Sequence, residues 1–104
     1  MLKVTLIEDG PKTITLKLEG RIAGQWVDEL ERECEKQLET HKKLVLDVFG
    51  VTFVDDRGIR MLMSVGGDRV ELIRCSLFIS ELLRTEGIHR ESRPRRCKPE
   101  EPGV

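Results

Sequence analysis

The segment from Leu44 to Ile59 has the sequence LVLDVFGVTFVDDRGI, and the other elements of the chain can be placed around it. Its first part, Leu44 to Phe49, is a nearly continuous apolar run that only Asp47 interrupts. Runs of this kind are typical of strands that are covered on both faces, which are usually central and parallel. Gly50 breaks the run before the apolar pattern resumes. The segment therefore predicts a central, parallel strand.

A turn and a helix follow this strand. The turn is Asp55-Asp56-Arg57-Gly58, and helical spacing continues to about Gly66. Asp56 is placed to cap the helix, because an aspartate before the first turn accepts hydrogen bonds from amides that have no partner within the helix. Gly66 and Gly67 predict its end, since glycine adopts the left-handed conformation that terminates helices. We expect this helix to span about residues 57–66.

The residues before this segment predict a hairpin and an amphipathic helix. Residues 3–8 and 13–19 alternate apolar and polar side chains with a period of two, which indicates strands. Asp9-Gly10-Pro11 between them has the composition of a turn. Residues 23–39 place apolar side chains three and four apart, which indicates a helix with one buried stripe. The stripe consists of Ala23, Trp26, Val27, Leu30, Cys34 and Leu38.

The residues after it predict a last strand over 70–74, a helix over 77–84 and a tail. Because strands alternate with helices, we expect an α/β fold with a mixed four-stranded sheet and helices packed on it, in the order β-β-α-β-α-β-α. One domain covers residues 1–87. Residues 88–104 are rich in arginine and proline, so they predict a disordered tail. The last strand is then an open edge, which would allow the chain to pair with another chain or with a second copy as a homodimer.

The composition limits the classes of function. The 104 residues are 36% charged and 38% hydrophobic with a net charge of −1, so no excess of charge indicates nucleic acid or a membrane surface. No apolar run approaches the roughly 18 residues that cross a bilayer. Cys34, Cys75 and Cys97 are widely spaced, which predicts reduced thiols of a cytoplasmic protein rather than a metal site, and no motif predicts a cofactor.

The central segment also carries a resemblance to a known family. An apolar strand with an aspartate, the link GVTFVD and a turn that opens a helix resemble the central stretch of STAS domains, the family of the anti-sigma factor antagonists. Asp55 matches the family's aspartate before the turn, and Gly58 matches the glycine that opens the helix. The resemblance covers about residues 3–87 and implies a STAS-like fold.

Two positions depart from the family. Asp56 and Arg57 stand where the family usually has two small residues, and in anti-sigma factor antagonists the second is the serine that a partner kinase phosphorylates. Arg57 cannot accept a phosphoryl group, so there is no phosphoacceptor at the family position. An arginine there can bind a partner's carboxylate, or it can neutralise Asp55 and Asp56 in a purely structural cap. The sequence leaves both interpretations open.

The resemblance implies a non-catalytic protein-interaction module, a bacterial anti-sigma factor antagonist that regulates transcription in the cytoplasm. Its implied partner is an anti-sigma factor or a histidine-kinase-like serine kinase. The alternatives are a STAS subunit of a transporter complex, of the lipid-transport ATPase or anion-transporter type, and a nucleotide-binding STAS sensor. No glycine-rich phosphate loop supports the sensor. Adjacent Asp55 and Asp56 without a nearby histidine do not indicate an enzyme.

We expect the partner to bind the turn and the outer flank of the helix that follows it. The turn lies at the carboxyl end of the central strand, where open α/β sheets usually bind their ligands. The helix has apolar residues on more than one face, and a sheet can bury only one face. The predicted contact residues are Asp55, Asp56, Arg57, Gly58, Arg60, Met61, Ser64 and Val65.

Incubation of the purified protein with ATP and an antagonist-specific serine kinase should leave the turn unphosphorylated, because Arg57 occupies the acceptor position. Peptide mapping by mass spectrometry measures this directly. Phosphate on a residue between Val54 and Leu62 would contradict the prediction. Thr52 and Ser64 are the hydroxyl residues to distinguish from the turn.

Overall fold

The computed structural model describes residues 1–40, 43–90 and 97–98, with residues 86–90 and 97–98 described by their backbone alone. The predicted order β-β-α-β-α-β-α is confirmed, and a short 3-10 turn and a two-residue strand are added to it. The elements are β1 (Leu2–Asp9), β2 (Thr13–Ile22), α1 (Gln25–Thr40), β3 (Lys43–Val54), α2 (Asp56–Ser64), η1 (Gly67–Arg69), β4 (Val70–Ile73), α3 (Leu77–Arg90) and β5 (Cys97–Lys98).

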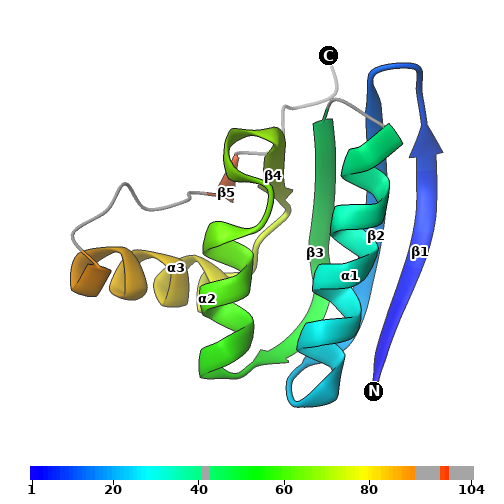
Figure 1. Ribbon diagram of the computed structural model, residues 1–104. Helices are drawn as coiled ribbons and strands as arrows, with labels where there is room; N and C mark the ends of the chain where they lie inside the picture. The colour runs from blue at the N-terminus through cyan, green and yellow to red at the C-terminus, as the bar shows by residue number, and fades with distance from the viewer. Residues whose placement is uncertain (41–42, 91–96, 99–104) are drawn as a thin grey trace.

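The strands form one mixed sheet in the order β1-β2-β3-β4-β5 (Figure 1). β1 pairs antiparallel with β2, while the pairs β2–β3, β3–β4 and β4–β5 are parallel. The predicted mixed sheet with β3 at its centre is therefore confirmed. α1 and α2 make the crossovers between parallel strands and lie over the same face of the sheet, and α3 packs against α2.

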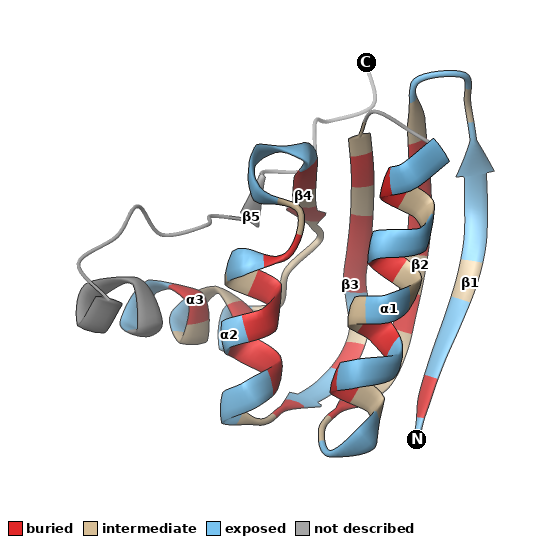
Figure 2. Ribbon diagram, viewed as in Figure 1, coloured by how far each residue is buried: buried red, intermediate tan, exposed pale blue. Residues whose placement is uncertain are grey.

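The core lies between the helices and one face of the sheet (Figure 2). The side chains of β2 and β3 that point to the helices are buried: Ile14, Leu16, Leu18, Leu44, Leu46 and Val48. They meet the buried residues of α1, which are Val27, Leu30, Cys34 and Leu38. The expectation that β3 is covered on both faces is wrong at Phe49, which is 64% exposed, because α1 and α2 both pack on the other face.

Three details differ from the expectations. β3 continues through Gly50 to Val54, because irregularities in its register with β2 accommodate the glycine. β4 is not an open edge, since β5 pairs with it opposite Leu72 and Ile73. Cys75 is disulfide-bonded, so the prediction of reduced thiols is wrong there, whereas Cys34 is a buried free thiol.

The C-terminal part of the chain is described only in pieces. α3 continues past the expected domain boundary at residue 87 and ends at Arg90. Most of the expected tail, residues 91–96 and 99–104, lies outside the described residues. Within the described ranges, no helix is long and apolar enough to cross a membrane.

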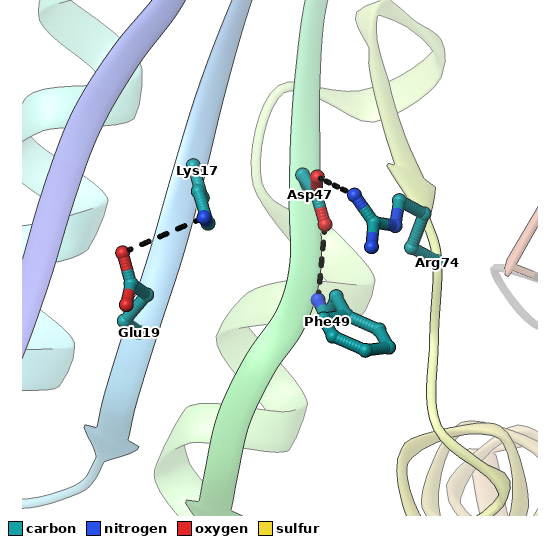
Figure 3. A network of polar contacts seen from close by, with 5 residues as sticks. All are labelled: Lys17, Glu19, Asp47, Phe49 and Arg74. Atoms are coloured by element: carbon teal, nitrogen blue, oxygen red, sulfur yellow. Dashed lines mark hydrogen bonds and ion pairs between the residues drawn. The ribbon is translucent and has the colours of Figure 1, made fainter.

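A buried carboxylate fixes the end of β4 on the sheet face opposite α1 and α2 (Figure 3). Asp47 is 2% exposed, and its two oxygens accept the backbone N–H of Phe49 at 3.0 Å and a guanidinium N–H of Arg74 at 3.3 Å. The guanidinium of Arg74 also lies over the Phe49 ring, 4.3 Å from its centroid. These contacts hold Arg74 at a φ of 57°, a conformation that is unfavourable for residues with a Cβ.

Arg74→Ala should lower the free energy of unfolding by about 1–3 kcal/mol, because it leaves the buried Asp47 carboxylate without its charged partner. Urea denaturation followed by circular dichroism measures the change. Lys17→Ala is the matched control, since Lys17 pairs with Glu19 on the same face at 3.9 Å but the two side chains are 40% and 41% exposed. Such an exposed pair contributes little. Equal losses for the two variants would contradict the role assigned to Asp47.

Candidate functional site

Asp55 caps α2. Its backbone is extended, with φ −84° and ψ 177°, and its Oδ1 accepts the N–H of Gly58 at 2.7 Å. The expectation that Asp56 is the cap is therefore wrong, and α2 begins one residue before and ends two residues before the expected span of about 57–66. Either aspartate could serve as a cap chemically, and the choice depends on β3 ending at Val54. Asp56 is instead an exposed residue of the first helical turn, where the helix dipole favours a negative charge.

The second carboxylate oxygen of Asp55 reaches the loop between β2 and α1. Oδ2 accepts the N–H of Gly24 at 2.9 Å, and the backbone N–H of Asp55 donates to the carbonyl of Ile22 at 3.1 Å. The hydrogen bond from Gly24 is the main cause that lowers the pKa of Asp55, and the N–H of Gly58 and two nearby arginines add to it, whereas partial burial opposes it. Asp55 is thus held as a carboxylate that ties the starts of α1 and α2 together.

Gly58 lies where α2 approaches the end of β2. A Cβ at this position would be 2.7 Å from the carbonyl oxygen of Ile22 and 2.8 Å from Cγ1 of Val54. Gly58 is buried, so its contribution to the site is to allow this close packing. A larger residue would push the start of α2 away from the sheet.

Arg57 bridges the two helices. Its Nη2 lies 2.7 Å from Oδ1 of Asp28 on α1, and the two side chains are 55% and 56% exposed. The structural interpretation, in which Arg57 neutralises Asp55 and Asp56, holds only as a contribution to the lowered pKa of Asp55, because the ion pair itself is made with Asp28. The sequence did not single out Asp28, since it is one of many acidic residues on the polar face of α1.

An open groove of about 260 Å³ lies between α1 and α2, the two helices that cover the same face of the sheet (Figure 1). The residues that line this α1–α2 groove are Val27, Asp28, Glu31, Arg57, Arg60, Met61 and Ser64. Two acidic and two basic side chains face it, so its charges balance. No group of three or more His, Cys, Asp or Glu side chains that could hold a metal ion occurs in the part of the chain that the structure describes. The α1–α2 groove is the candidate site.

The predicted contact residues are only partly brought together there. Arg60 and Ser64 line the groove and are exposed, and the Ser64 hydroxyl donates to the Arg60 carbonyl at 2.9 Å. Met61 and Val65 are each 5% exposed, so their placement on the outer flank is wrong, although Met61 lines the groove. The reason is that α2 packs against both α1 and α3, which bury more than one of its faces. Val65 follows the helix as its C-cap.

Asp55→Asn should lower the free energy of unfolding at neutral pH by about 1–2 kcal/mol, because an amide NH₂ replaces one of the two oxygens that accept N–H groups. The pKa of Asp55 is below its ordinary value of 3.8 in the folded protein, so its carboxylate stabilises the fold above that pH. The contribution is lost as the pH falls through the folded-state value. Urea unfolding at a series of pH values should show the wild type and the variant converging in acid. A difference that stays constant to below pH 3.8 would contradict this.

Solved structures with this fold include anti-sigma factor antagonists. The antagonist SpoIIAA in its unphosphorylated form matches with a TM-score of 0.72 at 12% identity, over 94% of this chain and 88% of that one. An antagonist from Mycobacterium paratuberculosis matches with 0.71 at 14% identity, over 99% and 88%. Phosphorylated SpoIIAA from Bacillus gives 0.62 at 15% identity, over 94% and 91%. At these identities the likeness shows the fold alone, and no curated protein matches the chain in sequence.

The sequence itself matches a family model described as "Mlab, STAS domain" over residues 6–90. This span includes Asp55, Gly58 and every residue that lines the α1–α2 groove. The chain therefore belongs to the STAS domain family, as the resemblance of its central segment implied.

Proposed function

We propose that the chain is a non-catalytic protein-interaction module of the anti-sigma factor antagonist type, which binds its partner at the α1–α2 groove. The observation that carries this proposal is the ion pair between Arg57 and Asp28 across the groove. Both side chains are more than half exposed, and such a pair contributes only about 0–1 kcal/mol. A charged group of a partner can therefore replace either member with little loss of stability.

The contacts of Asp55 favour a binding role over a catalytic one. Its two oxygens already accept the backbone N–H groups of Gly24 and Gly58, and its lowered pKa makes it a weak base near neutral pH. The same hydrogen bonds fix the starts of α1 and α2 before a partner arrives. A preformed groove loses less conformational entropy on binding than one that must be ordered.

The partner we infer is an anti-sigma factor or a histidine-kinase-like serine kinase in the cytoplasm. The structural likeness to antagonists supports this partner class. By the family resemblance, Arg57 occupies the phosphoacceptor position, and its side chain has no hydroxyl that a serine kinase could phosphorylate. Binding at the groove is therefore controlled by something other than phosphorylation of this turn.

A STAS subunit of a transporter complex, such as a lipid-transport ATPase, is the second candidate. Arg57 at the phosphoacceptor position favours it, because a constitutive subunit needs no phosphorylation switch. The identity of the bound partner distinguishes the two candidates. Affinity capture with the tagged chain from its native cells, followed by mass spectrometry, supplies that identity.

Arg57→Glu should weaken binding of the purified partner by about 1–3 kcal/mol in calorimetry, because it reverses a charge in the groove. Arg84→Glu is the matched control, since Arg84 forms a similarly exposed ion pair with Glu81 on α3, with side chains 67% and 54% exposed. It should leave the affinity unchanged.

Unchanged affinity for both Arg57→Glu and Arg60→Glu would show that the partner binds elsewhere. Capture of an anti-sigma factor or its kinase supports the first candidate, and capture of a transporter component supports the second. Capture of an unrelated enzyme complex whose affinity is the same for the wild type, Arg57→Glu and Arg60→Glu would contradict both candidates.

A further inference from the structure

β1 is an edge strand with an unusual number of exposed apolar side chains. Val4 is 37% exposed, and Leu6 and Ile7 are each 51% exposed. Figure 2 shows that most of β1 is exposed although it belongs to the sheet. Long apolar edge strands are normally protected, because they present unpaired backbone groups to other chains. The α1–α2 groove does not account for this surface, since β1 lies beyond the other side of α1 (Figure 1).

The backbone of β1 presents hydrogen-bonding groups to its open side. Leu2 lies opposite Gly20, and the N–H of Arg21 donates to the carbonyl of Met1 at 3.1 Å. In an antiparallel ladder this pattern makes Leu2, Val4 and Leu6 non-hydrogen-bonded positions, up to the register shift that follows Leu6. The N–H and C=O groups of Val4 and Leu6 therefore point away from β2.

The exposed side chains of Val4 and Leu6 lie on the face that carries the helices. Val4 is opposite Leu18 and Leu6 is opposite Leu16, and both of these β2 residues are buried beneath the helices. α1 does not cover β1 completely, and a groove of about 350 Å³ remains between them. It is lined by Leu2, Val4, Trp26, Glu29, Leu30 and Glu33.

We propose that β1 is the contact strand of a symmetric homodimer, in which the strands of two copies pair antiparallel with Thr5 on the twofold axis. Val4 then lies opposite Leu6 of the partner subunit, and the two residues exchange both backbone hydrogen bonds. The same pair occurs twice by symmetry. The exposed side chains of Val4 and Leu6 from both copies gather on one face, and the two sheets become one continuous sheet with the helices on the same side.

Charge complementarity identifies a second copy as the occupant. Lys3 is opposite Glu19 and Glu8 is opposite Thr15, so both side chains lie on the face opposite α1 and α2. With the axis at Thr5, Lys3 lies opposite Ile7 of the partner subunit and beside Glu8 of the partner subunit, twice in each dimer, since the register shift after Leu6 puts Glu8 on the same face as Lys3. An axis at Val4 would separate these charges. An axis at Leu6 would place Lys3 opposite Asp9 of the partner subunit, but it would also place Glu8 opposite Val4. Of these three registers, the axis at Thr5 is the one that places Val4 and Leu6 opposite apolar residues of the partner subunit and also brings Lys3 beside Glu8.

Sedimentation equilibrium of the full chain over a dilution series tests the proposal. The wild type should dimerise reversibly, and Leu6→Lys should raise the dimer dissociation constant by more than about tenfold, because two apolar contacts per dimer are lost. Leu77→Lys is the matched control, since Leu77 is equally apolar and 80% exposed but lies at the start of α3. It should leave the dissociation constant unchanged.

A charge exchange tests the register. Lys3→Glu and Glu8→Lys should each raise the dissociation constant by about three- to tenfold, because each creates two pairs of like charges per dimer. The double variant restores opposite charges and should return it to near the wild-type value. Amide hydrogen exchange at high protein concentration should protect Val4 and Leu6 in the wild type.

A wild type that stays monomeric at every concentration would overturn the proposal, as would a dimer that Leu77→Lys disrupts and Leu6→Lys does not. Failure of the double variant to recover would overturn the proposed register. Protection of Val4 and Leu6 only when a different protein is bound would show that the edge takes a foreign strand instead. None of these outcomes bears on partner binding at the α1–α2 groove, so the homodimer and the proposed function can fail independently.

Discussion

One carboxylate, that of Asp55, connects the three parts of the chain that build the candidate site. Its oxygens accept the N–H groups of Gly24 and Gly58, and its own N–H donates to the carbonyl of Ile22. The end of β2, the start of α1 and the start of α2 are therefore held at one point. Gly58 allows α2 to approach this point closely, since any Cβ would collide with β2. The spacing of α1 and α2, and so the width of the groove, depends on these contacts.

The rest of the site follows from that spacing. α1 and α2 are close enough for Arg57 to reach Asp28, and this exposed pair lies over a base formed by buried residues such as Met61. The hydrogen bonds of Asp55 fix the shape of the groove. The Arg57–Asp28 ion pair contributes little to stability, so a charged group of a partner can replace either side chain. The edge strand β1 lies on the other side of α1, so pairing between two copies leaves each groove accessible (Figure 1).

Sequence alone predicted the features that depend on local periodicity. The alternation in residues 13–19 and the apolar run in residues 44–49 identified β2 and β3, because side chains on a strand repeat every two residues. Features that depend on residues far apart in the sequence could not be predicted from local periodicity. Met61 is buried because α2 packs against two other helices, and Asp28 is a site residue because α1 passes beside Arg57. The cap was predicted one residue too late. Asp55 and Asp56 have the same side chain, and the position at which β3 ends, Val54, decides which of them caps α2.

The most direct measurement of the central claim is a pH titration of the backbone amide resonances of Gly24 and Gly58 by NMR. Both amides donate to the same carboxylate, so both resonances should shift along a single curve whose midpoint lies below 3.8, the ordinary pKa of an aspartate. Neutralising Asp55 by Asp55→Asn should abolish the two titrations together. Two amides that titrate independently, or a shared midpoint at or above 3.8, would show that Asp55 does not hold α1 and α2 together.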